Sequence, residues 1–292
     1  MIEPKPIRPC SSPVSAAPLL LKLGGALLDD ADALDATLRS VAALHQAVPG
    51  SVVLVHGGGS AVDRQLAALS WTSEKREGIR ITPPAHMEQI AGVLAGSLNT
   101  TLVARLIAAG AGAIGLSLTD GFLAQCELRG APDFDPGRVG SVVGGSPTII
   151  QTLLAARFLP VISSIGADAT GQLVNVNADD AASALARIIR PRMLVFLTDV
   201  SGVRAPNGAT AQHLTARDAA DWISNGTISG GMIPKVRGAL ESAERSNTPV
   251  VIASWREAAV LQRLQRGEHV GTRVIASESP RTSHAWAHAS KP

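Results

Sequence analysis

A lysine near the end of an apolar segment is the first residue whose type and place suggest chemistry. Lys22 lies in "LLLKLGG", residues 19–25, and Gly24 and Gly25 follow it closely. Lysine is among the residues least often fully buried. Its side chain therefore either extends along the apolar surface to reach solvent or faces a bound anion such as a phosphate. This segment alone leaves both interpretations open.

Glycines recur after other apolar segments: Gly57–Gly59 follow "VVLVH", Ser201–Gly202 follow "LTDV", and Gly230–Gly231 lie in "TISGGMIPKV". In an open α/β sheet, ligands bind beyond the carboxyl ends of the strands. Glycine-rich loops that open onto helix N-termini offer free N–H groups to a phosphate or carboxylate. One such cluster is most often a tight turn, but several at several strand ends favour an anion site.

The sequence matches neither of the two common nucleotide-binding motifs. The chain contains no GxxxxGK[ST], so it is not a P-loop enzyme. The nearest match to GxGxxG spans residues 57–62 and has Val62 at the position where Gly or Ala is needed for close helix–strand packing. If the protein binds a nucleotide, the residues that bind it belong to neither of these two motifs.

Two further features carry polar groups. In "LVNVNADD", Asn175, Asn177 and Asp179 recur with a period of two, which places them on one face if the segment is extended. The competing interpretation is an Asn/Asp turn with a helix N-cap. Lys235 lies just inside a predicted helix, where the helix dipole favours acids, so a lysine fits better beside a bound anion.

Composition excludes several classes of function. A net charge of +2 with scattered basic residues gives no basic stripe for nucleic acid, and only four Phe, four Trp and no Tyr are available for base stacking. Cys10 and Cys126 are too few for a disulfide framework or a zinc site, so no metal ligands are predicted. No continuous apolar run approaches the roughly 20 residues of a membrane span. Residues 1–18, with five prolines, are expected to form a flexible tail, and the expected location is the cytoplasm.

Apolar strands alternate with helical patterns along the chain. Strands are predicted at 19–25, 51–59, 113–117, 159–166, 193–202 and 249–254, with helices at 29–47, 83–110 and about 231–246, and a hairpin excursion at 120–145. This pattern predicts an α/β fold, an open αβα sandwich with a mostly parallel central sheet.

Taken together, these residues resemble the amino acid kinase family over residues 19–277. The resemblance rests on the order and spacing of "KLGG" (22–25), "VHGGG" (55–59), "GIRIT" (78–82), "LPVISSIG" (159–166), "GQLVNVNAD" (171–179), "LTDVSGV" (197–203), "ISGGMIPKV" (228–236), "VIASW" (251–255) and "GTRVIAS" (271–277). It implies an acceptor-binding, dimerising lobe at 19–192, an ATP-binding lobe at 193–278, and tails at 1–18 and 279–292.

The resemblance also assigns roles. It implies that Lys22 and Lys235 hold the transferring phosphoryl group and that Asp179 organises both lysines. The acceptor side is implied to be formed by Gly25, Gly58, Gly59, Arg80 and Asn175. The nucleotide side is implied to be formed by Asp199, Val200, Ser201, Gly202, Val203, Arg204, Ser229, Gly230 and Gly231. Ser229–Gly230 stand where some relatives carry Thr-Asp, so no side-chain contact to the nucleotide is implied there.

The reaction implied by the resemblance uses ATP, with Mg²⁺, to phosphorylate the side-chain carboxylate of N-acetyl-L-glutamate, a step of arginine biosynthesis. No tightly bound cofactor is implied. A carboxylate is already ionised at pH 7, so no general base is needed, and the planar fork of Arg80 suits a carboxylate. Arginine-inhibited relatives form hexamers through an N-terminal helix. Prolines at 4, 6, 9, 13 and 18 would interrupt that helix, so a homodimer insensitive to arginine is expected.

Three alternatives stay open at this point. A kinase of the same fold could act on N-acetyl-aminoadipate or carbamate, and one methylene gives only about 1–3 kcal/mol of discrimination. A Rossmann-type oxidoreductase is disfavoured by the broken glycine motif. A non-catalytic nucleotide-binding regulator is disfavoured because Lys22, Asp179 and Lys235 are all present.

Overall fold

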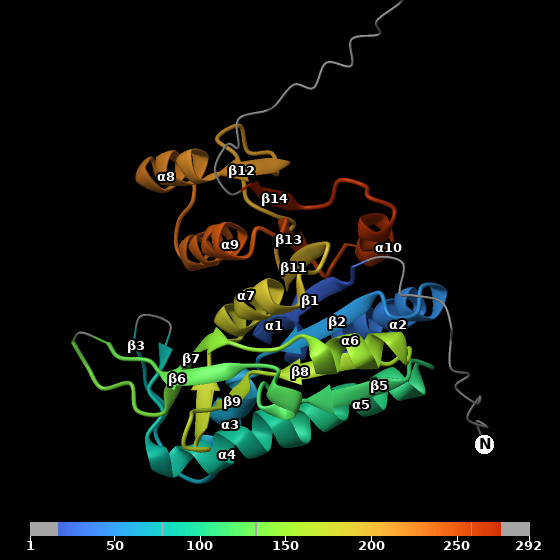
Figure 1. The fold of residues 1–292 in the computed structure, drawn as a ribbon. Coiled ribbons are helices and arrows are strands. Elements are labelled where there is room, and N and C mark those ends of the chain that lie inside the picture. The colour runs from blue at the N-terminus through green and yellow to red at the C-terminus, as the bar shows by residue number, and fades with distance from the viewer. Residues whose placement is uncertain (1–16, 77–78, 132, 258, 276–292) are drawn as a thin grey trace, which may run out of the picture.

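One eight-stranded sheet, in the order β12-β14-β13-β11-β1-β2-β8-β5, organises the fold (Figure 1). The computed structural model describes residues 17–76, 79–131, 133–257 and 259–275. Six strands run parallel and β12 and β14 run against them, which confirms the predicted α/β class with a mostly parallel sheet. The strands of this sheet are β1 (Leu19–Leu23), β2 (Val52–His56), β5 (Ala113–Leu116), β8 (Leu159–Ser163), β11 (Met193–Thr198), β12 (His213–Thr215), β13 (Val250–Ser254) and β14 (Thr272–Ile275).

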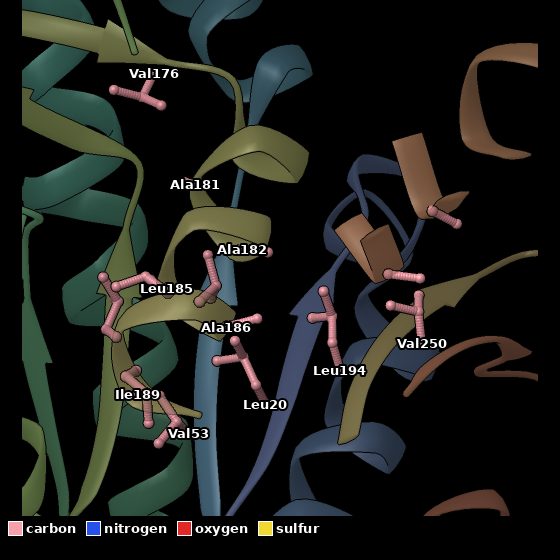
Figure 2. Close-up of a cluster of buried hydrophobic side chains, with 14 of the residues drawn as sticks. Leu20, Val53, Val176, Ala181, Ala182, Leu185, Ala186, Ile189, Leu194 and Val250 are labelled. Carbon is pink, nitrogen blue, oxygen red and sulfur yellow. The ribbon is translucent and has the colours of Figure 1, made fainter. Parts of the chain in front are cut away.

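The central strands are mostly apolar because helices bury both of their faces, and their polar residues, such as Lys22 and His56, lie at or near the strand ends. In β1, Leu19, Leu21 and Leu23 belong to one core cluster, whereas Leu20 belongs to the other. This alternation is the period of two expected for a strand. Figure 2 shows the second cluster, in which Leu20 packs with residues of α7 and the neighbouring strands.

Two sets of helices form these cores. Residues of α1, α2, α5 and α10 pack on one face, and residues of α6, α7, α8 and α9 pack on the other. Asp30 caps α2 by accepting a hydrogen bond from the Ala33 N–H at 3.0 Å. The helices are α1 (Gly25–Leu28), α2 (Ala31–Ala47), α3 (Gly59–Ala68), α4 (Met87–Ala91), α5 (Asn99–Ala108), α6 (Thr148–Ala155), α7 (Ala178–Ile189), α8 (Ala216–Ser224), α9 (Met232–Ser246) and α10 (Val260–Gln265).

A second sheet of four strands, β6-β7-β10-β9, lies beside the main sheet. Its antiparallel hairpin pairs β6 (Gln125–Leu128) with β7 (Val139–Gly144), which confirms the predicted hairpin excursion. The other two strands are β9 (Ile165–Ala167) and β10 (Leu173–Val176), and a small separate hairpin pairs β3 (Lys75–Arg76) with β4 (Ile79–Arg80).

The long helix predicted at 83–110 is present, with one irregularity. Residues Gly92–Leu98 between α4 and α5 form a π-helix, the wider form that is often found at functional sites. By length and composition alone, the stretch Pro84–Ala108 is apolar enough to cross a membrane. It is not a continuous apolar run, because polar residues such as Glu88, Asn99 and Arg105 interrupt it. Leu102 and Leu106 of this stretch are buried in the core of the main sheet.

The predicted lobes meet within one sheet. The boundary between 192 and 193 falls just before β11, and β11 pairs in parallel with β1 along its whole length. The predicted N-terminal tail, apart from residues 17 and 18, and the predicted tail at 279–292 lie outside the described residues. Both tails and the lobe boundaries stay predictions.

Candidate active site

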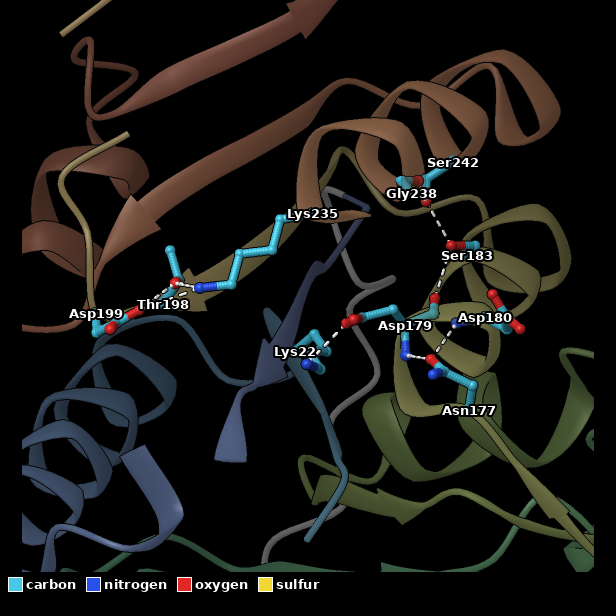
Figure 3. A network of polar contacts seen from close by, with 10 residues as sticks. All are labelled: Lys22, Asn177, Asp179, Asp180, Ser183, Thr198, Asp199, Lys235, Gly238 and Ser242. Atoms are coloured by element: carbon cyan, nitrogen blue, oxygen red, sulfur yellow. Dashed lines mark hydrogen bonds and ion pairs between the residues drawn. The ribbon is translucent and has the colours of Figure 1, made fainter. Parts of the chain in front are cut away.

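Lys22 lies on the face of β1 that looks toward α7, because the strand alternates its side chains. The Lys22 side chain is only 14% exposed, and its Nζ lies 2.7 Å from Oδ1 of Asp179 (Figure 3). Asp179 is in the first turn of α7, where the helix dipole favours an acid. The fold therefore joins a strand end and a helix start through one ion pair.

The start of α7 is set by Asn177. Its Oδ1 accepts hydrogen bonds from the N–H groups of Asp179, at 2.8 Å, and Asp180, at 3.3 Å. Strand β10 ends at Val176, so the predicted period-two face does not continue through Asn177 and Asp179. The turn-and-cap interpretation is the correct one, because a free asparagine amide oxygen satisfies helix N–H groups that otherwise have no partner.

Lys235 lies in the first turn of α9 and has different partners. Its Nζ is 2.9 Å from Oγ1 of Thr198 and 3.1 Å from Oδ1 of Asp199. In this structure Asp179 is paired with Lys22, and Asp199 is the carboxylate paired with Lys235. The role of Asp179 in organising both lysines stays a prediction. Hydrogen bonds from Thr198 and then Lys235 hold the pKa of Asp199 below its ordinary value.

Two cavities meet at Lys22. The first is lined by Lys22, Gly25, Asp179, Asp199 and Lys235, among others. The second, which also includes Lys22, Gly25 and Asp179, extends to the predicted acceptor residues Gly58, Gly59, Arg80 and Asn175. Residues from distant parts of the sequence thus surround one continuous region, in which an anion in either cavity would lie against Lys22.

Lysine is rare in this chain, and its distribution is informative. All three lysines in the described part of the chain line these two cavities: Lys22 both, Lys235 the first and Lys75 the second. Arg80 and Arg129 add two guanidinium groups to the second cavity. The region is suited to bind an acceptor and a donor that are both anionic.

Arg80 is held in place before any acceptor arrives. Its side chain is 8% exposed, and its Nη2 donates to the Gly59 carbonyl at 2.8 Å. Its Nη1 donates to Asp63 and Ser73. The hydrogen bond from Arg80 is the main reason that the pKa of the Asp63 carboxyl lies well below its ordinary value. Arg80 is therefore charged, buried and fixed at the wall of the second cavity.

The remaining acceptor residues lie in the same wall. Asn175 donates from Nδ2 to Thr82 Oγ1 at 3.1 Å, which fixes its amide. Gly24, to which the resemblance gives no role, lies close to β11, and a Cβ there would make a tight contact of 3.1 Å with the Leu197 carbonyl oxygen. Gly25 lines both cavities. In agreement with this position, a Cβ added at Gly25 would have no other atom within 4 Å.

The predicted nucleotide residues divide into two groups. A third cavity is lined by Asp199, Val200, Ser201, Gly202, Arg204 and Ser229, among others. Val203 does not line it: its side chain is fully buried in the core. Gly230 and Gly231 also do not line it, and they lead into α9 instead. Asp199 lines both the first and the third cavity, so the two adjoin.

Several site residues were missed by sequence reasoning. Thr198 and Trp255 line the first cavity, and each lies at or directly after the end of a central strand, a position that could have drawn attention to them. Asp63, Ser73 and Lys75 carry no such signal, because only the folded chain brings Ser73 and Lys75 to Asp63 on α3. In the residues that the structure describes, no group of three or more His, Cys, Asp or Glu side chains could hold a metal ion.

The sequence matches the model of the amino acid kinase family over residues 18–254. The chain belongs to the amino acid kinase family. It is 44% identical over 259 residues to acetylglutamate kinase of Edwardsiella ictaluri, covering 89% of this chain and 99% of that protein. It is 41% identical over 266 residues to acetylglutamate kinase of Vibrio cholerae, covering 90% of this chain and 99% of that protein.

Solved structures agree with this membership. The crystal structure of smu.665 from Streptococcus mutans, 25% identical, superposes with a TM-score of 0.71 over 89% of this chain and 98% of that one. N-acetylglutamate synthase from Neisseria gonorrhoeae, complexed with coenzyme A and N-acetyl-glutamate, gives a TM-score of 0.76 at 22% identity. That match covers 90% of this chain but 60% of the synthase. At such identity the synthase shows the amino acid kinase fold alone.

Proposed function

We propose that this chain transfers the γ-phosphoryl group of ATP, bound with Mg²⁺, to the side-chain carboxylate of N-acetyl-L-glutamate. The product is N-acetyl-L-glutamyl 5-phosphate, and the step belongs to arginine biosynthesis. The observation that carries the proposal is the junction of two cavities at Lys22, with Lys235 facing one and Arg80 the other. The relatives named acetylglutamate kinase support the choice of acceptor.

The chemistry proposed at the junction is mainly electrostatic. Phosphoryl transfer passes through a loose transition state with charge on the equatorial oxygens, so positioning and charge stabilisation dominate. Lys22 and Lys235 would stabilise that charge from the two sides of the junction, while Asp179 and Asp199 hold their ammonium groups in place. The attacking carboxylate is already ionised, so none of the histidines acts as a base.

The second cavity is proposed to bind the acceptor. N-acetyl-L-glutamate has two carboxylates, and the cavity has Lys22 at one end and the buried Arg80 in its wall. One carboxylate would face the phosphoryl group at Lys22, and the other would bind the guanidinium of Arg80 with help from Asn175. Carbamate has a single small anionic group, so it has no second carboxylate for Arg80 to bind.

The first and third cavities are proposed to bind ATP in the C-terminal lobe. Asp199 lines both, and Arg204 and Ser229 lie in the third. Gly202 has a φ of +146°, and a Cβ there would lie 2.6 Å from Thr272 Oγ1, so this turn of the cavity wall requires glycine. Because ATP is the donor, the cytoplasm is the proposed location.

A comparison of acceptors tests this proposal. ADP release is measured with N-acetyl-L-glutamate, L-glutamate, N-acetyl-L-aminoadipate and carbamate at equal concentrations. N-acetyl-L-glutamate is expected to give the highest kcat/KM, by about tenfold or more over the analogue with one additional methylene. A higher kcat/KM with N-acetyl-L-aminoadipate or carbamate would overturn the assignment in favour of that acceptor.

We further propose a homodimer that packs through the helix of α4 and α5. Its outer face carries a stripe of exposed small residues, Ser97, Thr101, Ala104 and Ala108, beside the 55% exposed Ile107. Small residues permit close helix packing, and burying Ile107 would be favourable. Light scattering should give twice the 30.0 kDa chain mass, and Ala104→Glu should shift it to a monomer. A wild-type monomer, or a hexamer, would contradict this interface.

A further inference from the structure

A buried histidine–asparagine pair lies directly behind the glycine loop of the second cavity. His56 is the last residue of β2, and its exposure is 0%. Its Nδ1 lies 2.8 Å from the carbonyl oxygen of Gly57, and its Nε2 lies 3.0 Å from Nδ2 of Asn99. His56 does not line the cavity, so any effect it has on the reaction passes through the loop.

The hydrogen-bond partners fix where the protons lie. Nδ2 of Asn99 is also 2.9 Å from the carbonyl oxygen of Val161, which can only accept. The Leu116 carbonyl oxygen lies farther away, at 3.5 Å, so the two amide hydrogens are assigned to the nearer acceptors, Val161 and Nε2 of His56. Nε2 is then the acceptor, so the ring proton is on Nδ1 and is donated to Gly57. The Gly57 carbonyl can also only accept, which independently requires the ring proton on Nδ1. Burial lowers the pKa of His56 to about 4, which keeps this neutral form in place.

The Gly57 carbonyl and the Gly58 N–H belong to the same peptide group. In a trans peptide these two groups point in opposite directions, and the structure contains no cis peptide bond in its described residues. A carbonyl held toward His56 therefore turns the Gly58 N–H away from the core, toward the second cavity that Gly58 lines. Gly58 precedes α3, so its N–H is free of helix hydrogen bonds.

We propose that His56 is a positioning residue for the acceptor site: through the Gly57 carbonyl it aims the Gly58 N–H at the substrate, and Asn99 selects the histidine tautomer that does so. This role rests on the proposed function of the second cavity. It is distinct from catalysis, because His56 touches neither the cavity nor any reacting group.

The surroundings leave the loop little freedom to adopt another orientation. Gly58 has φ of +150°, and a Cβ there would collide with Cδ2 of Leu98, at the end of the π-helical segment. Asn99 begins α5 directly after this segment, so the π-helix carries both the residue that packs on the loop and the residue that binds His56. The side chain of Asn99 also packs against Gly115. A Cβ at residue 115 would collide with Asn99 Oδ1, so Asn99 fits only because this residue is glycine.

Two substitutions separate positioning from packing. His56→Asn keeps a donor near the place of Nδ1, whereas His56→Gln keeps a partner for Asn99 near the place of Nε2. His56→Asn removes more buried volume and should have the lower Tm. It should nevertheless keep kcat/KM for N-acetyl-L-glutamate within about fivefold of wild type. His56→Gln should lose about tenfold or more, because one oriented hydrogen bond of about 1.4 kcal/mol is lost.

The opposite ranking, or activities that simply follow Tm, would overturn the positioning role. The tautomer is tested without any activity measurement, by nitrogen NMR of the protein labelled with ¹⁵N-histidine. His56 should show a protonated Nδ1 in wild type and lose this preference in Asn99→Leu, and a wild-type ring protonated on Nε2 would contradict the proposal. If wild type fails to phosphorylate N-acetyl-L-glutamate yet shows the Nδ1 tautomer, the proposed function fails and the hydrogen-bond assignment stands.

Discussion

At the scale of single residues, the site depends on cations that are each held by a carboxylate. Lys22 pairs with Asp179, Lys235 with Asp199, and Arg80 with Asp63. These pairs orient long side chains that would otherwise lose conformational entropy when substrate binds. The three pairs come from different elements, so each holds its cation against a different wall of the joined cavities.

Removing either lysine ammonium should chiefly slow the chemical step. Lys22→Ala and Lys235→Ala are each expected to lower kcat by at least about two orders of magnitude, because a group that stabilises transition-state charge is lost. Steady-state kinetics with saturating ATP and N-acetyl-L-glutamate measure this. Arg217→Ala, a change on α8 outside the three cavities, is the control and should be neutral. Near-normal turnover in either lysine variant would remove that lysine from the mechanism.

Arg80→Lys should affect acceptor binding more than turnover. Lysine keeps the charge but cannot bind Asp63, Ser73 and Gly59 while presenting a planar fork to a carboxylate. KM for N-acetyl-L-glutamate is expected to rise about 10- to 100-fold, with a smaller change in kcat. Arg64→Lys, at an exposed pair with Asp29, should leave both parameters unchanged. An unchanged KM in Arg80→Lys would show that Arg80 does not bind the acceptor.

Sequence reasoning reached the cations of the site but not all of their partners. Lys22 and Lys235 stand out because each lies near a pair of glycines, whereas Arg80 is indicated only by the family resemblance. Asp63 and Ser73 could not be predicted, since an acid on an amphipathic helix and a serine in a loop have no local signature. The pairing of Lys235 with Asp199 instead of Asp179 depends on the relative placement of α9 and β11, which no local pattern encodes.

At the scale of elements, the start of α7 decides where Asp179 lies. Asn177→Ala removes the side chain that accepts from Asp179 and Asp180 and should cost about 1 kcal/mol of stability. It should also lower kcat several-fold, because Lys22 loses a fixed partner. Asp30→Ala removes the matching cap of α2 and should cost similar stability with normal kcat. The urea midpoint and kcat are measured for both cap variants. If the two variants have equal kcat, the cap of α7 has no effect on activity and the prediction is wrong.

The regular elements could be predicted because their periodicity is local. The strands β1, β8 and β13 read as apolar runs since both sheet faces are covered, and α2 and α9 show helical spacing with clear ends. Two features could not be predicted. The π-helix at Gly92–Leu98 keeps an apolar pattern like that of an α-helix, and the end of β10 at Val176 is decided by a cap that competes with strand pairing.

At the scale of the whole molecule, the two predicted lobes are joined by the sheet and by helix packing. β1 pairs with β11, and Ser183 of α7 is joined to α9 by a hydrogen bond between its hydroxyl and that of Ser242 (Figure 3). The cavities at Lys22 and Asp199 lie along this junction. Relative movement of the lobes would therefore change the distance between donor and acceptor.

Stability should fall as pH falls from about 6.5 to about 4, because of His56. Its pKa is lowered from 6.5 to about 4 in the folded protein, so in this window the unfolded chain binds the extra proton. The folded state then loses up to about 3 kcal/mol as pH falls, and the loss is absent above pH 6.5. Urea unfolding at pH 7, 6 and 5 measures this. The slope with pH should be smaller in His56→Asn, and an equal slope would contradict burial of a neutral His56.

Formation of the acyl phosphate tests the central claim most directly. Wild-type enzyme with MgATP and N-acetyl-L-glutamate is trapped with hydroxylamine, which converts a side-chain acyl phosphate to a hydroxamate. We predict hydroxamate in equal amount to the ADP formed, and a loss of about a hundredfold in rate for Lys22→Ala. ADP release without hydroxamate would show hydrolysis of ATP instead of transfer to the carboxylate, and would contradict the proposed reaction.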